Sequence, residues 1–391
     1  MSPINKRKYI SLIFMYALML MIGILSSDIY LPSMPHMQQY FVANYSTIQY
    51  TLTFFLLFLS FFQFLLGPLS DRIKNEKMLC VGTALYCISS FFIVFSCSIS
   101  MLYFLRSIQA IGASFILVLA RKMITGLYPK NESQGFYTII LPIVSLCPAA
   151  APVIGGLLET NFGWRSCFLF LTASGILIQI LCINTLKRVT QKAVLQKKVS
   201  ILGSYYNLLS IRNFSIFSLS VGLSYFIWFS YLSVSPFLYS SYMLSSTQIG
   251  FCYMSQSIFA VFGVIIAKKI VNKRSIKFIF GISAINAIIC SLLITTINTP
   301  KLITFIILMT QLAQSTGILI TFGISAAMNT TAKQYKSLTG TASGLVGSIQ
   351  ILGGMLGTVT MSFFSPTAHA LGGVLLGASL LISILSFCID A

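Results

Sequence analysis

Residues 187–212 read KRVTQKAVLQKKVSILGSYYNLLSIR and form the longest polar segment of a chain that is otherwise mostly apolar. The segment contains six basic residues and no acidic one. Of the 391 residues, 57% are hydrophobic and only 8% are charged, whereas soluble domains carry roughly 25% charged residues. The segment therefore predicts a boundary between two membrane-embedded halves.

Six apolar runs precede this segment and six follow it. Each is close to the roughly 20 residues that an α-helix needs to cross the hydrocarbon core of a bilayer. We therefore predict an all-α membrane protein of about twelve transmembrane helices, with a six-helix bundle in 1–186, a cytoplasmic basic linker in 187–212 and a second six-helix bundle in 213–391. The predicted spans are Tyr9–Pro32, Thr47–Leu69, Met78–Cys97, Met101–Ile124, Gly135–Leu158, Cys167–Leu186, Phe214–Tyr239, Gln248–Ile266, Ile276–Ile297, Leu302–Ala326, Leu338–Phe364 and His369–Ile389.

The basic residues are distributed unevenly between the two sides of the predicted spans. With the N-terminus in the cytoplasm, all 25 Lys and Arg residues except Arg106, Arg165 and Lys301 fall on the inner side. This is the asymmetry typical of polytopic membrane proteins. It predicts a multi-pass inner (plasma) membrane protein with both termini cytoplasmic, and it accounts for the net charge of +19 without nucleic-acid binding.

Two charges lie inside predicted spans, Asp28 in the first and Arg106 in the fourth, within YFLRSIQAIG at residues 103–112. Each is five residues from the outer end of its span, near Ser33 and Met101, which places both roughly 7 Å below that face. A charge at such depth is costly unless it is paired or hydrated, and it typically marks an ion or substrate pathway. We predict that Asp28 accepts the coupling proton and that Arg106 is its alternating partner or modulates its pKa. A static ion pair, or a snorkelling arginine, that only holds helices together is the alternative.

A short repeat also relates the two halves. The residues Gly67-Pro68-Leu69-Ser70-Asp71-Arg72 follow the second span, and Gly263-Val264-Ile265-Ile266-Ala267-Lys268 stand at the corresponding place in the other half. Each segment has a glycine followed after five residues by a basic residue. Two parallel repeats with a binding site near the midplane are a known transporter plan.

Four motifs in the first half carry a resemblance to a known family. They are Gly67 to Ile73, Ser27 to Pro35, Arg106 to Gly112, and Pro148 to Gly156 followed by Gly163-Trp164-Arg165. The first resembles the signature of the major facilitator superfamily. Together the four resemble the drug:proton antiporters of the bicyclomycin-resistance (Bcr/CflA) type. The chain departs from the family pattern at Lys74, Asn75, Ala110 and Cys147.

The resemblance implies the major facilitator fold and roles for two groups of residues. Gly67, Asp71 and Arg72 would form a cytoplasmic gate, in which glycine permits close backbone approach and the charged side chains contact a neighbouring helix. The antiport motif would consist of the two prolines and two glycines of the fifth span, which kink the helix and admit a close neighbour. These are Pro148, Pro152, Gly155 and Gly156.

Aromatic and amide side chains within the spans are candidates for a largely apolar substrate cavity with few polar groups. Helix packing or lipid contact is the alternative for each of them. Tyr239 and Tyr242, at the outer end of the seventh span, are expected to anchor the membrane interface. The cavity candidates are Tyr30, Gln109, Tyr225, Trp228, Gln256, Asn286, Gln311 and Gln314.

The sequence thus predicts a proton-coupled secondary transporter, a multidrug efflux antiporter that exports amphipathic small molecules by alternating access. A proton-linked importer or exporter of a siderophore or native metabolite is the alternative. With six acidic residues and two histidines, His36 and His369, we expect no enzymatic site, no metal site and no cofactor besides the proton. No Gly-x-x-x-x-Gly-Lys-Ser/Thr run is present, so no nucleotide is expected. The expected partners are the lipid bilayer and a small molecule, with the protein as a monomer.

Overall fold

The computed structural model describes residues 6–69, 75–127, 139–140, 143–186, 201–271, 274–297, 301–334 and 339–389. Every regular element in these ranges is helical. The first half contains α1 (Lys6–Asp28), η1 (Leu31–Ser33), α2 (Met34–Tyr40), α3 (Tyr45–Leu69), α4 (Asn75–Ile93), α5 (Ile99–Leu127), α7 (Cys147–Phe162) and α8 (Arg165–Leu186). The second contains α9 (Ile201–Leu209), α10 (Arg212–Ser241), α11 (Ser246–Val271), α12 (Ile276–Thr296), α13 (Leu302–Gln334), α14 (Thr339–Ser362) and α15 (Ala368–Phe387).

The long helices correspond to the predicted spans, and the all-α fold class is confirmed. Within the described ranges, ten helices are long and apolar enough to cross a membrane, and α4 contributes a shorter apolar stretch, Lys77–Ile93. The fifth predicted span, Gly135–Leu158, is seen mainly as α7, because residues 128–138 and 141–142 lie outside the described ranges. The chain is therefore a multi-pass membrane protein.

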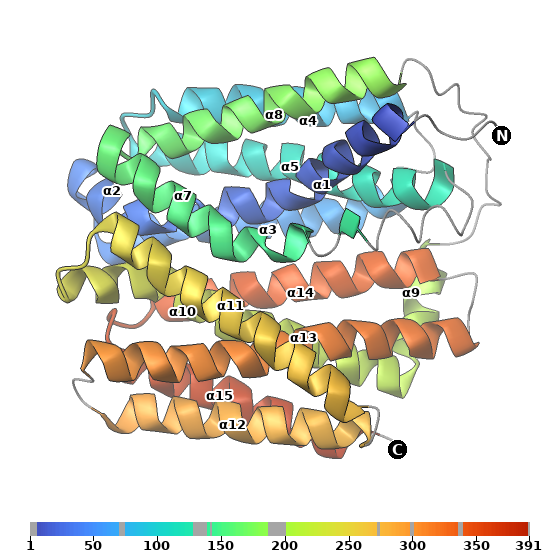
Figure 1. Ribbon diagram of the computed structural model, residues 1–391, viewed down its shortest axis with the longest axis vertical. Helices are drawn as coiled ribbons and strands as arrows, with labels where there is room; N and C mark the ends of the chain where they lie inside the picture. The colour runs from blue at the N-terminus through green and yellow to red at the C-terminus, as the bar shows by residue number, and fades with distance from the viewer. Residues whose placement is uncertain are drawn as a thin grey trace.

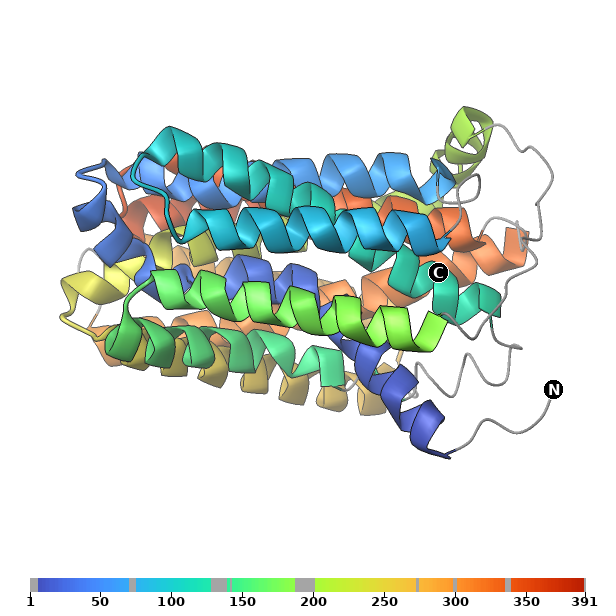
Figure 2. The same cartoon turned by 90° about the horizontal axis from the view of Figure 1, so that it is seen from above.

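The helices form two bundles that lie side by side (Figure 1). The blue-to-green helices of the first half fill one side of the molecule and the yellow-to-red helices of the second half fill the other. We call the end of the molecule that contains α2 the α2 end, and the opposite end, where α9 lies, the α9 end. Figure 2 shows the long helices running between these two ends.

Two pairs of long helices join the bundles, α3 with α14 and α7 with α11. In each pair, the second long helix of one half packs against the fifth long helix of the other. The arrangement is that expected for two halves related by an internal repeat. Its consequence is that α3, α7, α11 and α14 must part wherever the bundles separate.

Helix α12 has one exposed apolar face and one buried face, as the other long helices at the periphery do. Ile282, Ile285 and Ile289 are exposed large apolar side chains, whereas Ala284 and Ala287 are buried. Small residues on the protein-facing side let helices approach closely when lipid offers no hydrophobic contrast. The outward apolar face is therefore the surface that contacts lipid.

The interval predicted as a linker contains a helix. α9 lies within 201–212 and is followed closely by α10, and it contacts both α10 and α14. Tyr205 of α9 is buried, its ring lies 4.8 Å from that of Phe64 in α3, and burial raises its phenol pKa above the ordinary value. The sequence does not predict this helix, because the segment is polar overall. Nine residues are also too few to show a clear helical periodicity of apolar side chains.

The repeat also needs a correction in its position. Gly263–Lys268 lies inside α11, which continues to Val271, and not in a loop after the second span. The first copy likewise begins inside a helix, since α3 ends at Leu69. Apolar residues after Gly263 and lysines that the helix tolerates at its C-terminal end explain why α11 continues past the predicted boundary.

Candidate functional site

Asp28 is the last residue of α1 and lies where the two bundles meet. It is 5% exposed, and Ser27 Oγ donates a hydrogen bond to its Oδ1 over 2.6 Å. The carboxylate is within Coulombic reach of Tyr225 in α10 and Tyr253 in α11, both in the second bundle. The carboxylate is equally within Coulombic reach of Tyr30 and Cys147 of the first half, so the only acidic side chain of α1 lies where side chains of both halves meet.

Arg106 of α5 is completely buried inside the first bundle. Its Nη1 donates to the backbone carbonyl of Ser26 over 3.0 Å and to Gln109 Oε1 over 2.6 Å. The guanidinium carbon lies 4.4 Å from the ring centroid of Tyr30 and 4.3 Å from that of Phe55. Cations placed over aromatic faces in this way are attracted by the ring quadrupole. The positive charge is thus held by rings and carbonyl groups.

Asp28 and Arg106 do not form an ion pair in this conformation, although both belong to described helices. Their depths match, because Arg106 reaches Ser26, only two residues before Asp28. Two residues correspond to about 200° of rotation around a helix. Ser26 faces Tyr86 of α4, 2.7 Å away, so Asp28 points to the other side of α1. The predicted alternation of partners stays a prediction.

Glycines of the antiport motif let α7 contact both bundles. A Cβ atom at Gly155 would clash with the backbone carbonyl oxygen of Ile29, next to Asp28. A Cβ at Gly156 would clash with the carbonyl of Ser246 at the start of α11. Pro152 lies inside α7, and a Cβ atom at Gly250 of α11 would clash with its carbonyl oxygen. The motif therefore sits where α7 meets α1 on one side and α11 on the other, and Pro148 stands in the first turn of α7.

Polar contacts join the bundles on the side of the α2 end. Gln49 of α3 donates to Ser233 Oγ over 2.8 Å and to the carbonyl of Thr358 over 2.9 Å. The hydroxyls of Thr160 in α7 and Thr247 in α11 lie 2.9 Å apart. The bonds from Gln49 to Thr358 and between Thr160 and Thr247 span the two helix pairs that must part, and the bond to Ser233 joins α3 to α10. All three hold the bundles together at this end.

The predicted cavity residues of the first half belong to the surroundings of Arg106. Tyr30 is fully buried beside the guanidinium, and its hydroxyl lies 3.1 Å from Thr51 Oγ1. Gln109 accepts from Arg106 and donates to Ser90 Oγ over 2.7 Å. Both side chains thus belong to a polar network inside the first bundle, in which Arg106 Nε and Nη2 are buried without a hydrogen-bond partner among the described residues.

Of the predicted cavity residues of the second half, Asn286 and Gln311 are brought together, with Asn286 Nδ2 donating to the Gln311 backbone carbonyl over 3.3 Å, and the others make separate contacts. Asn286 of α12 donates to Ser315 Oγ of α13 over 2.7 Å, and Gln311 Oε1 accepts from Cys290. Gln314 packs against Gly263 of α11. Tyr225 and Trp228 are half-buried in α10, and Tyr225 is the one near Asp28.

Gln256 belongs to a buried tyrosine cluster that the sequence did not predict. Its Nε2 donates to the Tyr239 hydroxyl over 3.1 Å, and that hydroxyl lies 3.0 Å from the hydroxyl of Tyr231. The ring of Tyr253 is 5.9 Å from that of Tyr231. The expectation that Tyr239 anchors the membrane interface is wrong, because its side chain is fully buried. A helix-face projection of α10 and α11 would have grouped these residues.

The sequence also did not predict a contact between two ionisable side chains. His36 Nδ1 of α2 lies 2.6 Å from Glu159 Oε1 of α7. Glu159 follows Gly155 by one helical turn and so projects from a similar face of α7. The spacing of Gly155 and Glu159 could have shown from the sequence that Glu159 lies on the packed face of α7. The sequence gives no indication that α2 places His36 beside it.

Part of the predicted site lies outside the described residues. Asp71 and Arg72 of the cytoplasmic gate fall in 70–74, and of this group only the backbone of Gly67, in the last turn of α3, is described. Their role stays a prediction. No group of three or more His, Cys, Asp or Glu suited to a metal ion occurs in the searched, described part of the chain.

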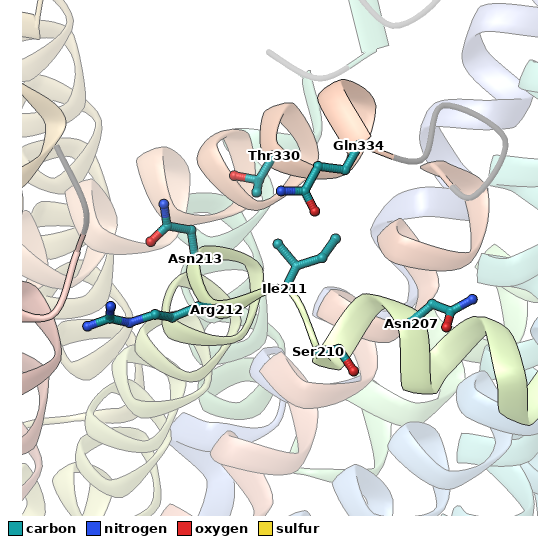
Figure 3. A pocket seen from close by; sticks show the side chains of 7 residues that line it. All are labelled: Asn207, Ser210, Ile211, Arg212, Asn213, Thr330 and Gln334. Atoms are coloured by element: carbon teal, nitrogen blue, oxygen red, sulfur yellow. The ribbon is translucent and has the colours of Figure 1, made fainter.

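A pocket of about 280 Å³ opens near the α9 end, between α9, α10 and α13 (Figure 3). None of the predicted cavity residues lines it, and it is remote in sequence and fold from Asp28. It is lined by Asn207, Ser210, Ile211, Arg212, Asn213, Thr330 and Gln334.

Comparison with known proteins gives consistent results for sequence and fold. The profile of the Major Facilitator Superfamily matches residues 16–358. The chain is 28% identical over 385 residues to the uncharacterized MFS-type transporter YdgK of Bacillus subtilis (strain 168), covering 96% of this chain and 94% of that one. It is 24% identical to Multidrug resistance protein D of Escherichia coli (strain K12), covering 89% and 88% of the two chains.

The fold also resembles the crystal structure of a D-xylose-proton symporter, with a TM-score of 0.75, 13% identity and coverage of 95% of this chain and 97% of that one. The family profile covers most of the chain, from within the first long helix to near the end of α14. The two bundles, their pairing and this match together identify the chain as a member of the Major Facilitator Superfamily, a membrane-embedded transporter of small molecules.

Proposed function

We propose that this transporter is a proton-coupled antiporter of the bicyclomycin-resistance type that exports amphipathic small molecules. The observation that carries the proposal is the buried carboxylate of Asp28, which lies within Coulombic reach of the second bundle and has no ion-pair partner among the described residues. Buried carboxylates of this kind bind and release protons when their surroundings change. The similarity to Multidrug resistance protein D supports a drug-like cargo.

In this mechanism the bundles alternate between opening at the α2 end and opening at the α9 end. We assign the α2 end to the outside and both termini to the cytoplasm of an inner membrane, because the basic residues favour that orientation. Polar contacts such as Gln49 with Ser233 hold the outer end together in the present conformation. Opening that end hydrates Asp28 and lets it take up a proton as cargo leaves.

Arg106 has a supporting role in this cycle. Its charge is fixed by Gln109 and the aromatic rings, on the other side of α1 from Asp28. A change in the tilt of α1 that brings Asp28 nearer to Arg106 would favour the ionised carboxylate and release its proton inward. The gate residues Gly67, Asp71 and Arg72 and the antiport motif of α7 would then control which end opens.

The direct test is transport by the full-length protein in proteoliposomes with an imposed pH gradient. We expect cationic dyes to move against their gradient when protons move the other way, and a pump-deficient, drug-sensitive host to survive better when it expresses the protein. Movement of cargo in the same direction as protons would instead indicate a symporter. Protection against no compound in a panel of cationic, neutral and zwitterionic drugs would favour the metabolite hypothesis.

A further inference from the structure

The α2 end contains a contact between an accessible imidazole and a buried carboxylate. His36 Nδ1 lies 2.6 Å from Glu159 Oε1, and the two side chains are 55% and 5% exposed. The short helix α2 holds the imidazole at the surface, whereas α7 holds the carboxylate among the helices. The contact therefore connects the solvent at the α2 end with the protein interior.

Glu159 has a second oxygen that the described residues leave unsatisfied. Its Oε2 is buried and has no hydrogen-bond partner among them. The other ionisable groups on neighbouring elements include Cys167 and Arg165 of α8, Asp28 of α1, and Cys252 and Tyr253 of α11. The Tyr253 hydroxyl lies 2.7 Å from Ser235 Oγ. The Cys167 thiol is directed to the Gly155 carbonyl, and Arg165 donates to the carbonyl of Val94. The imidazole of His36 is thus the basic group that contacts this carboxylate.

The position of Glu159 along α7 relates it to Asp28. The backbone of α7 touches α1 where Gly155 meets the carbonyl of Ile29, the residue after Asp28. Glu159 is four residues further along α7, which is about 6 Å nearer the α2 end. The two carboxylates therefore lie at successive levels beneath the surface that exposes His36.

We propose that His36 and Glu159 form a proton-uptake relay that supplies Asp28 from the α2 side. This inference rests on the proposed proton coupling. A proton from solvent converts His36 to imidazolium. Its Nδ1–H bond then breaks as an O–H bond forms at Glu159, leaving a neutral imidazole and a neutral carboxylic acid. When the α2 end opens, Glu159 releases that proton to the water that enters there, and this water carries it to the Asp28 carboxylate. Asp28 becomes neutral and Glu159 returns to its ionised form.

The two side chains suit these steps chemically. An imidazole accepts a proton at one ring nitrogen and releases one from the other. A carboxyl group likewise accepts at one oxygen and donates from the other, and Oε2 of Glu159 is the oxygen without a partner. A purely structural contact between α2 and α7 would need neither capacity.

The first test compares Glu159→Gln with wild type in proteoliposomes. Glutamine keeps a hydrogen-bonding group of the same shape but cannot bind and release a proton at physiological pH. The readouts are proton-driven dye transport, with acid on the α2 side, and dye counterflow at equal pH. We expect Glu159→Gln to slow proton-driven transport several-fold and to leave counterflow unchanged. Asn161→Ala, on the exposed side of α7, is the matched control and should change neither.

The second test uses chemical rescue and remains informative if Glu159→Gln does not fold. His36→Ala should slow proton-driven transport, and added imidazole should restore it, since the site is accessible from solvent. Wild-type rates in both variants, a parallel loss of counterflow, or the absence of rescue by imidazole would overturn the relay. Absence of proton-linked transport in the wild type would instead refute the proposed function itself.

Discussion

Arg106 Nη1 donates a hydrogen bond to the backbone carbonyl of Ser26 across 3.0 Å, and this bond fixes the buried guanidinium to α1. The contact brings the positive charge to the level of Asp28 but not to its side of the helix. The two charges thus share a depth and differ in direction. We therefore expect different effects from their replacement, on proton binding for Asp28 and on helix packing for Arg106.

Replacement of Asp28 with Asn is expected to abolish proton-driven transport while the protein still inserts in the membrane. Asparagine keeps the volume and a hydrogen-bonding group next to Ser27 but cannot bind and release a proton at physiological pH. Dye uptake driven by a pH gradient is the measurement, and counterflow at equal pH is the control. Asp28→Glu, which remains ionisable, should retain part of the activity. Unchanged proton-driven transport by Asp28→Asn would refute the assignment.

Replacement of Arg106 with Met is expected to lower stability more than replacement with Lys. Methionine leaves Gln109 without its donor, and an unsatisfied buried polar group costs about 1–3 kcal/mol. It also removes attraction to the rings of Tyr30 and Phe55, which is worth roughly 0.5–2 kcal/mol. Thermal unfolding of the detergent-solubilised protein measures the difference. A methionine variant as stable as the wild type would show that the network is dispensable.

Gly155→Ala is expected to destabilise the protein, by about 1–3 kcal/mol if the cost resembles that of overpacking a core. The added methyl group meets the backbone carbonyl of Ile29, which cannot rotate away as a side chain would. Gly373→Ala is the matched control, because a Cβ at Gly373 meets nothing within 4 Å. Thermal unfolding of the two variants side by side makes the comparison, and equal stability would contradict the close approach of α7 to α1.

A disulfide between residues 160 and 247 is expected to lock the α2 end and stop transport. The hydroxyls of Thr160 and Thr247 are 2.9 Å apart on helices of different bundles, a separation compatible with the short reach of a disulfide. The double variant Thr160→Cys with Thr247→Cys should lose transport on oxidation and regain it on reduction. Each single variant, treated in the same way, is the control. Full activity of the cross-linked form would show that this end need not open.

The sequence predicts the long helices well, because each is an apolar run bounded by charged or turn residues. It also predicts the shared depth of Asp28 and Arg106, since depth depends only on the rise along each helix. It does not predict direction around the helix axis, which requires knowing the neighbours, and this is why the two charges point apart. The contact of His36 with Glu159 depends on where a seven-residue helix lies, and hydropathy carries no information on that.

The aromatic residues show the same limit. Tyr239 lies at the end of a span and matches the pattern of an interface anchor, yet it is buried beside Gln256 of α11 and Phe305 of α13. Asn286 and Gln311 are equally plausible cavity residues from the sequence. In the structure, Asn286 Nδ2 donates to the Gln311 carbonyl, and this hydrogen bond joins α12 to α13. Residue type alone does not tell whether such a side chain lines a cavity, anchors the membrane interface or packs two helices together. Only the tertiary structure distinguishes these roles.

Adjacent glycines on α7 have different partners, α1 for Gly155 and α11 for Gly156. The first contact stays within one bundle throughout a rocking motion, whereas the second exists only while the bundles touch. Under the proposed mechanism, a bulkier residue at position 156 would therefore raise the energy only of the state in which the bundles touch at this end. Such a substitution would shift the balance between the two end states of the carrier.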